Sequence, residues 1–227
     1  MIASRSGRCV VFDLDDTLYD ELDFVRSGFA AVSAVIVDHF GFDARALLEG
    51  RLASRLLEGA FQSVQDAFGL PPRAVDLMLA TYRFHVPTLE MPRELHDALM
   101  ALRERDGAVA CITDGRSITQ RHKLQALGLA GLLAPVLISE ETGHGKPDAH
   151  NFREVMRRVE AREYWYIADN PAKDFVAPNA LGWITVSVDR GKRIHDLPAR
   201  AFPLDHLAKR QADLLNLVRE LAVMPVS

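Results

Sequence analysis

The chain has 227 residues, 48% of them apolar, and a formal net charge of −4 at pH 7. A chain of this length buries roughly 70% of its unfolded surface, which suits one large domain or a core with a smaller inserted domain. The composition excludes a disordered chain, and the lack of a basic excess argues against a nucleic-acid partner.

The chain shows no sign of export or membrane insertion. Its first residues lack an apolar stretch of signal-peptide length, and no later run is long enough to cross a membrane. The cysteines, Cys9 and Cys111, lie in or beside apolar runs, as is typical of small buried thiols in a reducing compartment. We therefore expect a cytoplasmic protein without a membrane partner, and the sequence leaves its oligomeric state open.

The first predicted strand, Cys9–Phe12, precedes an unusually long helical stretch. Helical spacing runs from Phe24 to Phe40, and the further predicted helices are Ala44–Leu57, Phe61–Phe68 and Arg73–Phe84. A stretch of this length is poor as a loop and reasonable as an inserted helical bundle. We therefore expect an inserted helical domain over residues 19–87 and a core domain over residues 1–18 and 88–227.

The rest of the chain alternates short apolar runs with helical patterns. The predicted elements are, in order, the helix Arg93–Arg105, the strand Ala108–Ile112, the helix Ile118–Leu127, the strand Val136–Ile138, the helix Phe152–Glu160, the strands Tyr164–Ala168 and Trp183–Val188, and the helix Leu204–Ala222. In the last helix, Leu207, Leu214, Val218 and Leu221 form one stripe that can pack on the core. The alternation predicts an α/β fold with a Rossmann-like parallel sheet covered by helices.

The first strand ends in the acidic sequence Asp13-Leu14-Asp15-Asp16-Thr17. Extended backbone places residues two apart on the same side, so Asp13 and Asp15 can face one reaction centre. The carboxyl ends of parallel strands are also where open sheets bind ligands. One carboxylate could attack phosphorus while the other exchanges a proton with the leaving group, although an acidic turn after a strand is an equally good reading of this segment alone.

The later strand ends add groups that suit phosphate and a metal ion. Thr113 and Asp114 precede a glycine after the second strand, and a hydroxyl with loosened amides there can hold phosphate oxygens. Lys146 follows the third strand and can supply an ammonium to the same phosphate. Asp169 and Asp174 follow the fourth strand. Because Asp13, Asp15 and these two acids cannot converge fully charged without a cation, we expect a metal site, and oxygen ligands favour Mg²⁺.

These four segments, in this order, resemble the haloacid dehalogenase-like (HAD) hydrolase superfamily. The resemblance implies that Asp13 is the nucleophile and Asp15 the general acid and base, with Thr17 supporting their loop by hydrogen bonding. It implies further that Thr113 and Lys146 bind phosphate, and that Asp13, Asp15 through its carbonyl, and Asp169 hold Mg²⁺. Asp174 is implied as a ligand or as a supporting partner. The inserted domain is similar to the helical cap that closes over substrate in this superfamily.

The resemblance makes phosphate-ester hydrolysis the expected reaction, with a small phosphorylated metabolite as the substrate. Dehalogenases of the superfamily lack the second aspartate, whereas Asp15 is present. Phosphonatases use a cap lysine, whereas residues 19–87 contain no lysine. Three alternatives stay open: a phosphomutase of the same superfamily, a receiver-like signalling domain, and a protein that binds phosphate esters without turnover. Arg116 could contact an anionic substrate group or lie along a surface helix.

Overall fold

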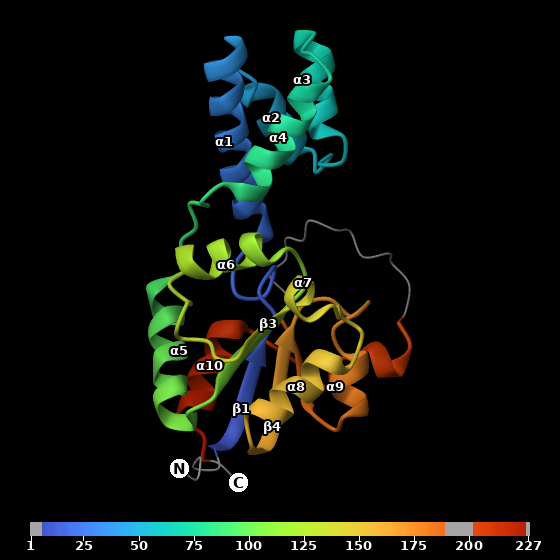
Figure 1. The fold of residues 1–227 in the computed structure, drawn as a ribbon. Coiled ribbons are helices and arrows are strands. Elements are labelled where there is room, and N and C mark those ends of the chain that lie inside the picture. Colours follow the sequence, from blue (N-terminus) through green and yellow to red (C-terminus); the bar gives the residue numbers. More distant parts are fainter. Residues whose placement is uncertain (1–5, 189–201, 226–227) are drawn as a thin grey trace. The chain divides into compact units, whose positions relative to one another are not determined.

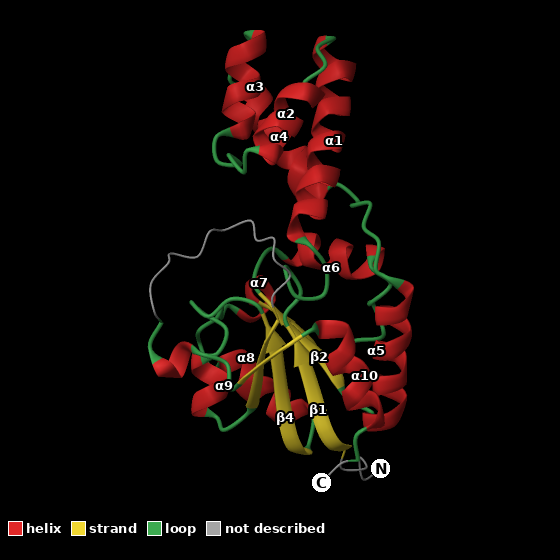
Figure 2. Cartoon of the chain, turned by 180° about the vertical axis from the view of Figure 1, so that it is seen from behind, coloured by secondary structure: helices red, strands yellow, loops and turns green. Residues whose placement is uncertain are grey.

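The computed structural model describes residues 6–188 and 202–225. Within these ranges, six strands form one sheet in the order β3-β2-β1-β4-β5-β6. Figure 2 shows β1 between β2 and β4. All neighbouring strands run parallel. The strands are β1 (Ser6–Phe12), β2 (Val109–Thr113), β3 (Val136–Ile138), β4 (Ala161–Ala168), β5 (Ile184–Val188) and β6 (Arg210–Ala212). The predicted α/β fold with a Rossmann-like parallel sheet is confirmed.

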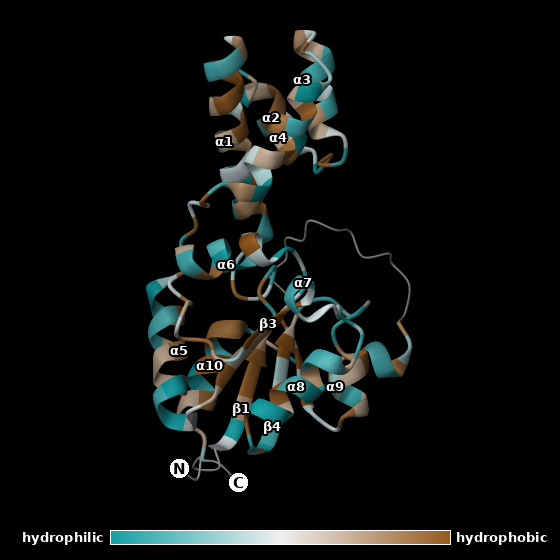
Figure 3. Ribbon diagram, viewed as in Figure 1, coloured by the Kyte–Doolittle hydropathy of each residue, from teal (hydrophilic) through white to brown (hydrophobic). Residues whose placement is uncertain are grey.

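Helices cover both faces of the sheet. On one face, α8 (His150–Arg158) and α9 (Val176–Ala180) contribute Phe152 and Ala177 to a buried cluster with Cys9 and Val11 of β1. On the other face lie α5 (Arg93–Asp106) and α10 (Leu214–Val223), side by side (Figures 1 and 2). The central strands are strongly hydrophobic (Figure 3), as expected for parallel strands buried on both faces.

β1 occupies the middle of the sheet, and its pairing sets which loops meet at the carboxyl edge. Phe12, the last residue of β1, pairs with Cys111 of β2 and Ile167 of β4. The residues that follow these three strands therefore start at the same level of the sheet. Two short helices continue from this region, α6 (Ser117–Ala126) after β2 and α7 (Ser139–Thr142) after β3.

The chain divides into two compact units, Met1–Asp20 with Glu90–Ser227, and Glu21–Leu89. The second unit contains α1 (Glu21–Phe40), α2 (Arg45–Ala53), α3 (Ala60–Phe68) and α4 (Arg73–Phe84). Its core joins Phe29 and Ile36 of α1 to Leu48, Val64 and Met78 of the other three helices, all buried. We call it the helical unit, and we call the first unit the core unit.

The main difference from the sequence prediction lies near the C-terminus. The predicted helix Leu204–Ala222 is wrong over its first half, because a 3₁₀ turn (Leu204–His206) and β6 precede α10. Asp213 ends the extended segment and caps α10, its side chain accepting a hydrogen bond from the amide of Asn216 at 2.9 Å. Leu207 therefore leaves the predicted stripe and is 41% exposed, whereas Leu214, Val218 and Leu221 are buried.

The other predicted elements are present with shifted ends. β1 and β4 begin three residues earlier than predicted, at Ser6 and Ala161. Both cysteines are buried free thiols. In the described part of the chain, no helix combines the length and the apolar character that a membrane span requires.

Candidate active site

Asp13 is placed by the end of β1. Its amide donates to the carbonyl of Ile167 at 2.9 Å, which carries the sheet pairing one residue beyond Phe12. The chain then turns sharply, with the amide of Leu18 donating to the carbonyl of Leu14 at 3.0 Å. Asp16 supports this turn with φ of 54°, a conformation that aspartate tolerates better than most residues.

Thr17 contacts the turn through its backbone. Its side chain is fully buried, and the hydroxyl has no hydrogen-bond partner among the described residues. The contact that Thr17 makes within the turn is through its backbone amide, which donates to Leu14 at 3.3 Å.

Three buried carboxylates converge at the edge of the sheet. Oxygen atoms of Asp13, Asp169 and Asp174 all lie within 4.8 Å of one another. Asp174 is fully buried, and its second oxygen accepts from the amide of Asn170 at 2.8 Å, which fixes the loop after β4. A set of hard oxygen donors that lacks histidine and cysteine suits a small divalent cation such as Mg²⁺.

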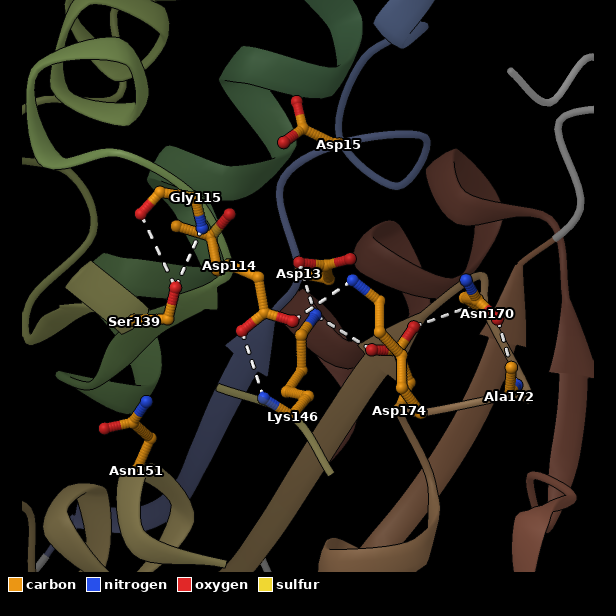
Figure 4. A network of polar contacts seen from close by, with 12 residues as sticks. Asp13, Asp15, Asp114, Gly115, Ser139, Lys146, Asn151, Asn170, Ala172 and Asp174 are labelled. Atoms are coloured by element: carbon orange, nitrogen blue, oxygen red, sulfur yellow. Dashed lines mark hydrogen bonds and ion pairs between the residues drawn. The ribbon is translucent and has the colours of Figure 1, made fainter. Parts of the chain in front are cut away.

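Lys146 lies against this cluster (Figure 4). Its ammonium is 2.8 Å from a carboxylate oxygen of Asp13 and 2.8 Å from one of Asp174, and it donates to the hydroxyl of Tyr166 at 3.2 Å. Burial of an ammonium is costly unless anions surround it. Lys146 therefore offsets part of the negative charge and leaves the cluster with an excess of carboxylates.

Burial dominates the ionisation of Asp13. It raises the pKa of Asp13 from 3.8 to about 6; the Asp174 carboxylate adds to this rise and the Lys146 ammonium opposes it. Burial also disfavours the charged form of Lys146, yet the two carboxylates hold its pKa well above the usual value. The cluster thus favours a bound cation, because a cation stabilises the ionised form of every carboxylate in it.

The loops after β2 and β3 are tied together beside Asp13. Asp114 accepts from the amide of Lys146 and from the ammonium of Lys173, each at 3.1 Å. The amide of Gly115 donates to the hydroxyl of Ser139 at 2.9 Å. In the structure, Asp114 therefore contacts two lysine residues and joins the loop that follows β2 to the one that follows β3.

Asp15 is set apart from this cluster (Figure 4). Its carboxylate accepts from the ammonium of Lys123 at 2.7 Å, from the side-chain amide of Gln120 at 2.8 Å and from the hydroxyl of Tyr19. Burial alone would raise the pKa of Asp15, but Lys123 and these hydrogen bonds outweigh burial and lower it. Asp15 is therefore an ionised acceptor in this state of the protein.

The haloacid dehalogenase-like hydrolase family matches residues 8–182. The chain belongs to this family. Among its relatives, a glyceraldehyde 3-phosphate phosphatase of Methanopyrus kandleri is 31% identical, over 95% of this chain and 98% of its own length. A phosphoserine phosphatase of Thermus thermophilus is 35% identical, over 69% of this chain and 62% of its own length.

Solved structures of haloacid dehalogenase-like hydrolases share the fold. The magnesium-bound hydrolase YfnB of Bacillus subtilis has a TM-score of 0.63 at 18% identity, over 97% of this chain and all of its own. The resemblance that the four sequence segments carry is thereby confirmed at the level of the family and the fold.

Two further features of this hydrolase concern residues outside the four segments. Arg116 is half-exposed and lies 3.8 Å from Glu140, so the structure shows it in a surface ion pair. Sequence reasoning missed Gln120 and Lys123, which contact Asp15. A signal existed, because Lys123 is the first of only five lysines in a chain with 22 arginines, and it stands one helical turn after Gln120.

Proposed function

We propose that this chain is a Mg²⁺-dependent phosphatase that hydrolyses small phosphate monoesters through a phosphoaspartate on Asp13. The observation that carries the proposal is the convergence of Asp13, Asp169 and Asp174 at the carboxyl edge of the sheet, where Lys146 contacts two of them. Membership of a hydrolase family and relatives named as phosphatases of small metabolites support it.

The metal site follows from the donor set. Asp13, Asp169, Asp174 and the carbonyl of Asp15 would hold Mg²⁺, which supplies positive charge to the phosphoryl oxygens when bound. The remaining phosphate contacts come from the chain itself, namely the Lys146 ammonium, the Thr113 hydroxyl and the amides after β2. Fixed positive charge and donors of this kind stabilise the charge of the transferring phosphoryl group.

The reaction divides into two displacements at phosphorus. First, a carboxylate oxygen of Asp13 forms a bond to phosphorus as the bond to the leaving oxygen breaks, and Asp15 gives that oxygen a proton. Water then attacks the phosphoaspartate, its proton passes to Asp15, and inorganic phosphate leaves. Asp15 must therefore acquire a proton before the first step, since it is ionised in the state described here.

The helical unit has a proposed role as a cap that selects the substrate. This role comes from the resemblance to capped members of the superfamily, in which the cap excludes water during transfer. Sugar phosphates, nucleotides and phosphorylated acids all stay candidate substrates.

Phosphate release from a panel of small esters, with Mg²⁺ and with EDTA, tests the proposal. We expect release that needs Mg²⁺, that Asp13→Asn abolishes, and that Asp97→Asn leaves intact, because Asp97 is 65% exposed on α5. Mass spectrometry of rapidly quenched enzyme should find the phosphoryl group on Asp13. Turnover by pure Asp13→Asn protein, or no turnover of any ester by folded wild-type protein, would overturn the proposal.

A further inference from the structure

Helix α6 buries two polar side chains that the reaction as proposed does not use. Gln120 is 1% exposed and Lys123 is 3% exposed. They stand three residues apart, so they share one face of the helix. Lysine is almost never fully buried unless it is paired, and a buried amide needs partners for its two N–H groups. We therefore expect polar contacts that explain why this face buries a glutamine and a lysine.

The two side chains of this face contact groups that the proposed reaction uses. The Lys123 ammonium is 2.7 Å from one carboxylate oxygen of Asp15, and the Gln120 amide donates to the other at 2.8 Å. The same Gln120 nitrogen also donates to the hydroxyl of Thr113 at 2.6 Å. Gln120 thus links Asp15, the proposed acid for the leaving group, to Thr113, a proposed phosphate-binding residue.

The helix that carries these residues is itself held in place. Arg121 donates twice to Glu141 of α7, at 2.8 and 2.7 Å. The amide of Ser117, at the start of α6, donates to the carboxylate of Glu140 of α7 at 2.7 Å. A helix that is held at its start and at its middle can set the position of a side chain that it contacts.

Tyr19 also helps to hold the Asp15 carboxylate in this position. The Tyr19 hydroxyl donates to the same Asp15 oxygen that contacts Lys123. The Lys123 ammonium lies 6.0 Å from the centre of the Tyr19 ring. Both carboxylate oxygens of Asp15 are consequently held from the α6 side, and Asp15 lies apart from Lys146 and Asp174 (Figure 4).

We propose that Gln120 and Lys123 are positioning residues that orient the Asp15 carboxyl for proton exchange with the leaving group. The inference rests on the phosphatase function proposed above and deepens it by naming what aims the acid and base. The two residues act through Asp15 and do not touch the reacting atoms. Replacing either residue should therefore lower kcat most for esters whose leaving group depends most on a proton.

The test compares two esters on the full-length enzyme. Departure of an alkyl alcohol, as from glycerol phosphate, needs a proton, whereas p-nitrophenolate leaves well without one. A general acid contributes about 10²–10⁴-fold to such a step. We expect Lys123→Met and Gln120→Met each to lower kcat for glycerol phosphate at least about 10-fold, as for the loss of a hydrogen bond to a charged group. For p-nitrophenyl phosphate, kcat should fall much less, and KM should stay nearly unchanged.

Gln125→Met is the matched control, because Gln125 is exposed on the same helix. It should leave both esters unaffected. In an Asp15→Asn background, Lys123→Met should cause no further loss on glycerol phosphate, since the residue acts through Asp15. Circular dichroism shows which variants fold, and Gln120→Met provides the test if Lys123→Met does not.

The outcomes separate this inference from the function on which it rests. If a folded variant loses equal activity on both esters, or adds its loss to that of Asp15→Asn, the positioning role is overturned while the phosphatase stands. If wild-type enzyme hydrolyses neither ester nor any other in the panel, the proposed function fails, and the positioning role falls with it.

Discussion

Asp13→Asn should stabilise the metal-free protein. The carboxyl of Asp13 is 5% exposed and lies beside Asp174, and its pKa in the folded protein is raised from 3.8 to about 6. The folded protein therefore keeps a proton that the unfolded chain releases between about pH 4 and pH 6. Linkage then requires that the free energy of unfolding falls as pH rises through this window.

The size of the effect follows from the shift. A difference of about 2 pKa units, at about 1.4 kcal/mol each, means that ionised Asp13 costs about 3 kcal/mol above pH 6. Asparagine has nearly the same shape, and its carbonyl oxygen can still accept from the Lys146 ammonium, which is 2.8 Å from Asp13. The variant should thus gain up to about this amount at pH 8 and nothing near pH 4, where Asp13 is protonated.

Urea denaturation in EDTA, at several pH values from 4 to 8, measures the difference. Asp97→Asn, which changes an exposed carboxylate, should show no comparable gain at pH 8. Adding Mg²⁺ should stabilise the wild type more than Asp13→Asn, because the variant lacks one proposed ligand. An Asp13→Asn protein that is no more stable than wild type at pH 8 in EDTA would refute this account of the site.

Two further substitutions test how buried charges are compensated. Lys146→Met leaves Asp13 and Asp174 without their shared ammonium, so it should abolish turnover and lower the free energy of unfolding in EDTA by about 3–5 kcal/mol at pH 8; a fully active variant would contradict this role. Arg8→Met removes a buried guanidinium that donates to the carbonyl of Leu221 at 2.7 Å, so it should cost about 1–3 kcal/mol in urea denaturation and loosen α10 in hydrogen exchange, without changing KM.

The fold was readable from the sequence because parallel strands buried on both faces leave continuous apolar runs. The strands at the centre of the sheet, such as Val10–Phe12, carry that signal strongly. β6 (Arg210–Ala212) does not, because it is an edge strand of three residues, and two of them, Arg210 and Gln211, are polar and exposed. The apolar spacing of Leu214, Val218 and Leu221 could therefore be extended backwards into a helix that does not exist.

The site was readable where chemistry follows a strand and was missed where it comes from a helix face. Asp13 and Asp169 each stand just after a predicted strand, and Lys146 lies in the segment that follows another, so topology alone brings them to one edge. Gln120 and Lys123 lie inside a helix with ordinary spacing, and nothing in the sequence says which neighbour that face meets. The contact with Asp15 depends on the register of α6, which only the three-dimensional structure provides.

Gly28→Ala tests whether the helical unit and the core unit have separate stabilities. A Cβ at Gly28 of α1 would lie 2.5 Å from ring atoms of Tyr82 of α4, and Phe24 and Phe61 pack against that ring. The ring cannot easily yield, so the variant should destabilise the helical unit by about 1–3 kcal/mol.

Gly50→Ala is the matched control for Gly28→Ala, because Gly50 lies inside α2 with nothing within 4 Å of the added atom, and it should be neutral or stabilising by up to about 1 kcal/mol. Hydrogen exchange followed by mass spectrometry reports each unit separately. If the two units unfold separately, Gly28→Ala should speed exchange in residues 21–89 and leave the amides of β1 and β4 in the core unit protected. The core unit carries every proposed reaction group. Equal loss of protection in both units would mean that they unfold as one, and that the chemistry of the core unit depends on the helices for its stability.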